Sequence, residues 1–146
     1  MTTSYSTDVV AWASEQARLI RAGRFDLLDL EHIAEEIEDV GKSEQRELAN
    51  RMAVLLAHLL KWQFQPERQG NSWRNTIRAQ RKEVGYLLDE APSLRTKLDE
   101  ARWLDMVWSK AIAQAGDETG LESWPEVMPW VMGDEVLNPD WLPSID

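Results

Sequence analysis

Apolar side chains recur at the spacing of an α-helix along most of the chain. In the first segment they fall three and four residues apart and share one helical face: Val9, Trp12, Ala13, Ala17 and Ile20. Thr7 or Asp8 precedes this segment as a capping residue, and Gly23 follows it where a glycine commonly closes a helix. The pattern therefore predicts a first helix between Asp8 and Gly23.

A second apolar stripe begins near Asp29. Its first members oppose acidic positions on the other face of the same helix: Leu30, Ile33, Ala34, Ile37 and Val40 against Glu31, Glu35, Glu38 and Asp39. The Gly41-Lys42-Ser43 segment is suited to ending one helix and capping the next. The apolar register nevertheless continues to Leu59 without a phase break, so one helix over residues 29–64, kinked near Gly41, is the alternative.

Two further helices are predicted after the first proline, Pro66. Ser72 caps the first of them, and Pro92 with Ser93 opens the second, which ends between Gly116 and Gly120. No segment alternates apolar and polar residues as a half-buried strand does. The pattern therefore predicts an all-α fold, an antiparallel helical bundle of four or five helices.

From residue 123 the pattern changes, because prolines interrupt a run of apolar side chains. We expect one domain over residues 1–146, with the bundle core in 1–122 and an apolar C-terminal arm in 123–146. The arm holds three of the eight tryptophans: Trp124, Trp130 and Trp141. Because tryptophan is enriched at interfaces, two interpretations stand equal. The arm either packs on its own bundle or covers a second subunit or a protein partner.

The charge of the chain is acidic overall and unevenly distributed. Its 146 residues carry 26 acids and 16 bases, a formal net charge of −10. Residues 26–47 hold nine acids and two bases, residues 61–82 hold six bases and one acid, and residues 115–146 hold eight acids and no base. Such a surface repels phosphates and anionic lipid except at its one basic stretch. We therefore expect no membrane partner and do not expect nucleic acid as a partner.

Several classes of chemistry are excluded by what the sequence lacks. Cysteine is absent, which excludes disulfides, thiol nucleophiles and thiolate metal sites. The N-terminus does not resemble a signal peptide, and the longest nearly apolar run, Met52–Leu60, is too short to span a bilayer. We therefore expect a cytoplasmic protein. Dinucleotide-binding, P-loop, serine-hydrolase and zinc-protease motifs are missing as well, so we favour a protein that is not an enzyme.

A histidine and a cluster of carboxylates are the first candidates for a polar site. His58 interrupts the apolar run and shares a face with Lys61. It is interpreted as a titrating or metal-binding group or, preferably, as a partly buried histidine that specifies packing. The carboxylates add four candidates: Glu35, Glu36, Glu38 and Asp39. The chain has no Glu-x-x-His motif for a di-iron site, so we predict no cofactor and assign no metal site. The preferred interpretation of the carboxylates is a solvated face or ion pairs with a neighbouring helix.

The basic candidates are three arginines that share one face of the helix after Ser72: Arg74, Arg78 and Arg81. One interpretation is a site for phosphate or another anion near a helix N-terminus. A second is single-stranded nucleic acid along residues 61–82, with Trp62 and Trp73 as stacking platforms. The preferred interpretation is ion pairing with the acidic stripe of the second helix.

Several sequence blocks together resemble a known family. They are AEEIEDVGKSE (residues 34–44), HLLKWQFQPER (58–68), SWRNTIRAQR (72–81) and ETGL (118–121), followed by the proline-containing tail. In this joint pattern the chain is similar, over nearly its whole length, to a bacterial family named as Domain of Unknown Function 29. The resemblance implies an all-helical fold and carries no catalytic residue to this chain.

The leading hypothesis is a small acidic cytoplasmic interaction module that associates with itself or with a protein partner. An alternative is a bundle that binds a ligand, anion or metal, or an enzyme, whose site uses five side chains: Glu35, Glu36, His58, Lys61 and Arg78. A third hypothesis is single-stranded nucleic acid binding along residues 61–82.

Overall fold

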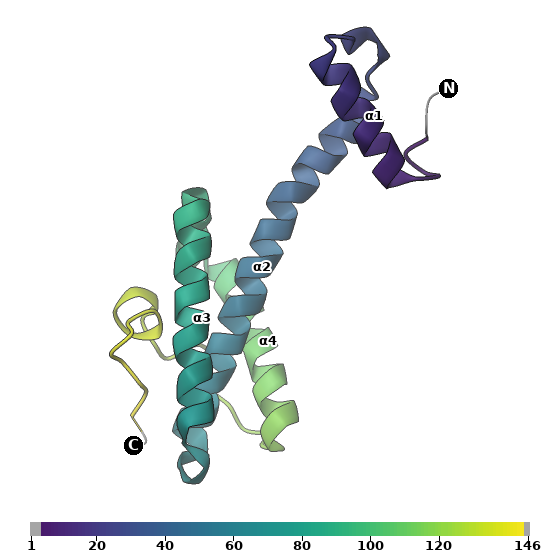
Figure 1. Ribbon diagram of the computed structural model, residues 1–146. Helices are drawn as coiled ribbons and strands as arrows, with labels where there is room; N and C mark the ends of the chain where they lie inside the picture. The colour runs from purple at the N-terminus through teal and green to yellow at the C-terminus, as the bar shows by residue number, and fades with distance from the viewer. Residues whose placement is uncertain (1–3, 145–146) are drawn as a thin grey trace. The chain divides into compact units, whose positions relative to one another are not determined.

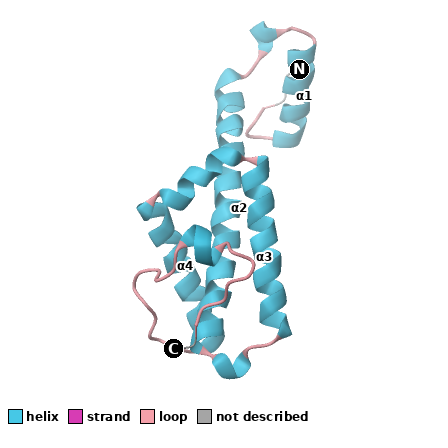
Figure 2. Cartoon of the chain, turned by 90° about the vertical axis from the view of Figure 1, so that its left-hand side faces the viewer, coloured by secondary structure: helices cyan, strands magenta, loops and turns pink. Residues whose placement is uncertain are grey.

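A computed structural model describes residues 4–144 as a series of helices joined by short connections (Figure 1). The α-helices are α1 (Val9–Arg21), α2 (Leu30–Phe64), α3 (Asn71–Glu90) and α4 (Ala101–Thr119). Shorter 3₁₀ and π turns lie between and after them: η1 (Phe25–Leu27), η2 (Pro66–Arg68), η3 (Pro92–Asp99) and η4 (Met132–Val136). No strand occurs in the described part of the chain (Figure 2). The predicted all-α fold with packed helices is confirmed.

The chain divides into two compact units, Met1–Ser43 and Glu44–Asp146, here called unit 1 and unit 2. The predicted single domain over residues 1–146 stays a prediction, and each unit is described by itself. Helix α2 contributes its first turns to unit 1 and the remainder to unit 2. Of the two alternatives for residues 29–64, the structure has the unbroken helix, with Gly41 inside it.

Unit 1 begins with the predicted caps of α1. The N–H of Ala11 donates to Oδ1 of Asp8 at 3.1 Å, so Asp8 rather than Thr7 caps the helix. Gly23 follows the end of α1 with a φ of 73°, a left-handed conformation that favours glycine. Among the described apolar residues of this unit, only Trp12 is buried.

Unit 2 has a continuous apolar core. The C-terminal part of α2 packs beside α3 and α4 (Figures 1 and 2). Each helix buries a stripe at three- and four-residue spacing: Leu48, Met52, Leu55 and Leu59 from α2, Ile77, Val84 and Leu88 from α3, and Val107, Ala111 and Ala115 from α4. This is the spacing that the sequence shows, so the helical register predicted for these segments is correct.

Two predicted helix starts in unit 2 are wrong. Helix α3 begins at Asn71 with Gly70 as its cap residue, so Ser72 lies inside the helix instead of capping it. Pro92 opens only the short turn η3, because the backbone becomes extended at Glu100 before α4 begins. The predicted end of α4 is correct, with Gly120 in the left-handed conformation at a φ of 77°.

The C-terminal arm packs against the helices of its own unit. Trp130 and Val136 are buried in the unit 2 core. The ring of Trp130 lies 5.6 Å from that of Trp108 on α4, with the planes nearly perpendicular. The indole N–H of Trp108 donates to the Pro125 carbonyl at 2.9 Å, which fixes the start of the arm. Within residues 4–144, no helix is long and apolar enough to cross a membrane.

Candidate functional site

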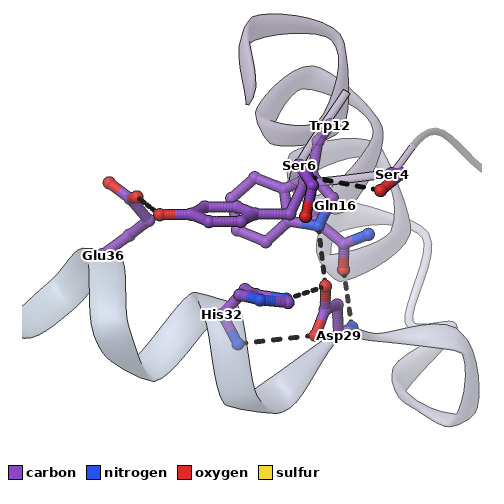
Figure 3. A network of polar contacts seen from close by, with 8 residues as sticks. Ser4, Ser6, Trp12, Gln16, Asp29, His32 and Glu36 are labelled. Carbon is purple, nitrogen blue, oxygen red and sulfur yellow. Dashed lines mark hydrogen bonds and ion pairs between the residues drawn. The ribbon is translucent and has the colours of Figure 1, made fainter. Parts of the chain in front are cut away.

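A polar network holds the start of α2 against α1 in unit 1 (Figure 3). The carboxylate of Asp29 lies at its centre. Oδ2 of Asp29 accepts from the indole N–H of Trp12 at 3.0 Å and lies 2.7 Å from Nδ1 of His32. The backbone N–H of Asp29 donates to Oε1 of Gln16 at 2.8 Å. Gln16 and Trp12 are both buried, so these bonds tie the inner side of α1 to the first turn of α2.

Tyr5 completes this network from the segment before α1. Its ring stacks on the imidazole of His32 with centroids 4.1 Å apart. Its hydroxyl donates to Oε1 of Glu36 at 2.5 Å, and this bond, with the acidic surroundings, raises the pKa of Tyr5 to about 12. The bond with Asp29 raises the pKa of His32 and lowers that of Asp29. Each of these polar residues has a hydrogen-bond partner, so we interpret the network as a set of contacts that stabilises the packing of α1 on α2 rather than as a reactive site.

Outside this network, unit 1 exposes most of its apolar side chains. The exposed large ones are Val9, Val10, Ile20, Phe25, Leu27, Leu30, Ile37 and Val40. The apolar stripe predicted at the start of α2 is therefore largely open, whereas its continuation from Leu48 onward forms the unit 2 core. The amphipathic pattern of α2 is correct, but within unit 1 α1 covers only one side of its first turns and leaves Leu30, Ile37 and Val40 exposed.

Helix α1 and the first turns of α2 form a helical hairpin, and their exposed apolar positions lie on one side of it. Tyr5, before α1, bonds Glu36 within α2, whereas Gln16, further along α1, bonds Asp29 at the start of α2. The order of the contacts is reversed, so the two helices run antiparallel. From the contact seam, the apolar stripe is rotated in the same sense on both helices, by roughly 50° on α1 and roughly 90° on α2. In antiparallel helices such rotations point to the same side. We call this surface the hairpin face: Val9, Ile20, Leu30, Ile37 and Val40.

The four predicted carboxylates do not form a common site. Glu36 is half-buried and bonded to Tyr5, whereas Glu35, Glu38 and Asp39 are exposed on α2. In residues 4–144, no group of three or more histidine, aspartate or glutamate side chains is arranged to hold a metal ion. The exposed acids correspond to the solvated face that the sequence favoured.

His58 and Lys61 meet in unit 2, as their spacing predicted. The side chain of Lys61 is only 7% exposed and forms an ion pair with Glu118 of α4. Its Nζ lies 3.4 Å from Nε2 of His58 and 5.3 Å from the ring centre of Trp73. Nδ1 of His58 lies 2.9 Å from the Val54 carbonyl, so one tautomer donates to that carbonyl and accepts from Lys61.

The electrostatics of this cluster fit a packing role. Burial lowers the pKa of His58, and the neighbouring ammonium of Lys61 lowers it further. For Glu118, burial alone would raise the pKa, but the bonds from Lys61 and Gln114 outweigh it and lower the pKa. Each member of the cluster therefore has a defined partner, and the arrangement favours the interpretation of His58 as a histidine that specifies packing.

The three predicted arginines line a groove of about 550 Å³ between α3 and the arm. Lys82 joins them, and the arm contributes Asp140 and apolar side chains. Arg74 lies over the ring of Trp62 at 5.1 Å, and Trp62 is buried. Trp62 is therefore not available as the stacking platform of the nucleic-acid hypothesis. The acidic stripe lies in unit 1, so its predicted pairing with these arginines stays a prediction.

The three arm tryptophans lie against their own unit. Trp130 is buried, and its ring lies 5.7 Å from that of Trp141. Trp124 is half-buried, packs against Phe64 at 5.5 Å and donates to the Leu121 carbonyl at 3.2 Å. These contacts support packing on the bundle, one of the two interpretations of the arm.

The sequence interpretation missed the Tyr5–His32–Asp29 network and the exposure of the hairpin face. A local signal for the network existed, because Asp29 precedes His32 by three residues at a helix start. The contact of Tyr5 with Glu36 has no local signal, because the two residues are 31 positions apart.

Comparison with known proteins gives one match. The model of the family described as Domain of unknown function DUF29 matches residues 4–142. No curated protein and no solved structure matches the chain. The matched region includes nearly all of both units, and the resemblance noted in the sequence is confirmed.

Proposed function

The chain belongs to the DUF29 family, and we propose that it is a small interaction module that pairs with a second copy of itself through the hairpin face. The observation that carries the proposal is the exposure of Leu30, Ile37 and Val40 along one stripe of α2. Large contiguous apolar patches on a protein surface commonly mark interaction sites. The cytoplasmic location of this module remains a prediction from the sequence.

The small core of unit 1 supports the proposal. Units of about 40 residues seldom bury enough apolar surface to be stable without disulfides, metals or association. Unit 1 buries Trp12 as its one large apolar side chain among the described residues, and the chain has no cysteine. Covering the hairpin face would supply the apolar burial that unit 1 lacks.

The available area fits a dimer. A large aliphatic side chain at such exposure offers roughly 100 Å² to a partner, as its transfer energy implies. Five of the eight exposed apolar side chains of unit 1 form the hairpin face, and Phe25 and Leu27 lie in the connection between its two helices. These seven side chains together offer on the order of 700 Å², close to the roughly 800 Å² that each partner of a standard interface buries.

Charge favours a second copy as the occupant. The first part of α2 carries its acids on the face opposite the hairpin face, whereas α1 has Arg18 and Arg21 in its last turn. A second copy that lays its α1 beside α2 places helices of opposite net charge next to each other, and this longer-range attraction acts twice in a symmetric pair. A copy that lays α2 against α2 would bring like charges together.

Light scattering during size-exclusion chromatography tests the proposal on matched variants. Ile37 and Val127 are 67% and 71% exposed, so Ile37→Asp and Val127→Asp replace comparably exposed apolar side chains inside and outside the hairpin face. We expect wild type and Val127→Asp to be dimers and Ile37→Asp to be a monomer with unchanged helicity by circular dichroism. A monomeric wild type, or a dimeric Ile37→Asp variant, would overturn the proposal.

A further inference from the structure

The groove between α3 and the arm is independent of the hairpin face, since it lies wholly within unit 2. We propose that it binds a small organic anion that has a phosphate or carboxylate head and a compact apolar body. Its cationic lining residues come from α3: Arg74, Arg78, Arg81 and Lys82. Asp140 is the single acid among the residues that line it.

The positive charge of the groove is only partly offset, because Asp140 is the single acid beside four cations. Elsewhere in unit 2, cations such as Lys61 and Arg95 form ion pairs with Glu118 and Asp89. None of the four groove cations forms an ion pair with a described residue of unit 2. Four cations gathered around a hollow with a single acid attract anions, and the low-dielectric walls of the hollow strengthen the attraction.

Two of the cations are held in place before any ligand arrives. Nε of Arg81 donates to the Val136 carbonyl at 2.9 Å, and its NH2 group donates to the Trp141 carbonyl at 2.7 Å. Arg81 therefore fixes the arm as one wall of the groove. The guanidinium of Arg74 is positioned by its stacking over Trp62. Binding to a preformed site costs less ordering entropy than binding to a flexible one.

Three of the four cations are spaced so that neighbouring members can share one head group. Arg74, Arg78 and Lys82 follow one another at four-residue intervals, so successive side chains rise by about 6 Å along the same face of α3. Two neighbouring members can reach the oxygens of one phosphate or carboxylate. Arginine contributes bidentate, charge-assisted hydrogen bonds to such oxygens, and lysine contributes a point charge.

The walls and the size of the groove indicate that the anion has an apolar body. The lining also includes apolar side chains from both elements: Ile77, Leu137, Pro139 and Leu142. The volume of about 550 Å³ falls in the range of small-molecule sites, roughly 300–1,000 Å³. It exceeds what inorganic phosphate alone requires, so an aromatic or short aliphatic group attached to the head would occupy the remaining space.

The test uses the full chain and four probes that separate head from body. Phenyl phosphate and hexanoate carry both parts, inorganic phosphate carries the head alone and phenol carries the body alone. Binding is followed by isothermal titration and by tryptophan fluorescence, since the guanidinium of Arg74 lies over the ring of Trp62. We expect saturable binding of phenyl phosphate, at least about tenfold weaker binding of inorganic phosphate and no measurable binding of phenol. Absence of saturable binding of phenyl phosphate and of hexanoate would overturn the proposal.

Variants locate the binding in the groove. Arg78→Gln with Lys82→Gln should weaken binding of phenyl phosphate by tenfold or more, because the charge-assisted bonds to the head are lost. Asp140→Asn should tighten binding several-fold, because a like charge at the rim is removed. Lys110→Gln changes an exposed cation of α4 outside the groove and should leave binding unchanged. Equal effects of the groove and control variants would show non-specific attraction and would contradict the site.

Discussion

Nδ1 of His32 lies 2.7 Å from Oδ2 of Asp29, and this contact sets one of the two histidines of the chain apart from the other. The bond with Asp29 raises the pKa of His32 above its ordinary 6.5, whereas burial lowers the pKa of His58 below that value. Nuclear magnetic resonance titration of the two imidazoles should therefore give two transitions, with His32 titrating at the higher pH. Asp29→Asn should lower the pKa of His32 and leave that of His58 unchanged. A reversed order of the two titrations would contradict the description of both surroundings.

The same pair predicts how the stability of unit 1 depends on pH. The folded-state pKa of His32 is raised, so its stabilisation is complete below pH 6.5 and is lost as the pH rises through the folded value. The folded-state pKa of Asp29 is lowered, so its stabilisation is present above pH 3.8 and is lost as the pH falls through the folded value. The contact between α1 and α2 should therefore be strongest between pH 3.8 and 6.5.

Hydrogen exchange of the α1 amides, corrected for the intrinsic rate at each pH, measures this dependence. Protection should decline above the folded-state pKa of His32. His32→Gln should remove that decline and leave the low-pH loss in place. Protection that keeps rising above neutral pH in the wild type would contradict the predicted role of the pair.

The buried ammonium of Lys61 predicts an asymmetry between two substitutions in unit 2. Glu118 is partly exposed, so in Lys61→Met its carboxylate can be solvated, and we expect a loss of at most about 1 kcal/mol in the free energy of unfolding. Glu118→Gln leaves the ammonium of Lys61 buried without a counter-charge and should cost roughly 2–3 kcal/mol. Urea unfolding of the two variants measures the difference. Equal losses would mean that Lys61 reaches solvent.

Arg81 should be the principal attachment of the arm to α3. Replacing it by lysine keeps the positive charge but removes the two guanidinium donors that bond the Val136 and Trp141 carbonyls. We expect Arg81→Lys to reduce the free energy of unfolding by roughly 1.5–3 kcal/mol. The arm should also become cleavable by glutamyl endopeptidase at Glu135. Arg78→Lys, which changes an exposed arginine one turn away, is the control and should alter neither property.

The local parts of this fold are those that the sequence predicts well. Asp8 and Gly23 terminate α1 as their chemistry requires, and the buried stripes of unit 2 follow the helical period. The sequence places the cap of α3 two residues too late, at Ser72 instead of Gly70, and it assigns Pro92 to the start of α4 although Pro92 opens only a short turn. Such boundaries depend on backbone geometry that several neighbouring residues satisfy almost equally.

Contacts between residues that are far apart in sequence are harder to predict. An apolar stripe shows that a helix has a face to bury, but it does not show what covers that face. Leu30 and Leu55 belong to one stripe of α2, yet the first is exposed and the second is buried. The sequence predicts the row of arginines on α3 but not the groove, because the second wall of the groove comes from the arm more than 50 residues later.

The most direct test of the proposed pairing asks where two copies meet. The chain has no cysteine, so single cysteines can be placed at Val40 on the hairpin face and at Val127 in the arm, both exposed positions. The two variants are treated at low micromolar concentration with a short flexible bis-maleimide. Because pairing through the hairpin face brings the two copies of residue 40 close together, we expect a covalent dimer from Val40→Cys and a monomer from Val127→Cys. Failure of Val40→Cys to cross-link, or equal cross-linking of both variants, would contradict pairing through the hairpin face.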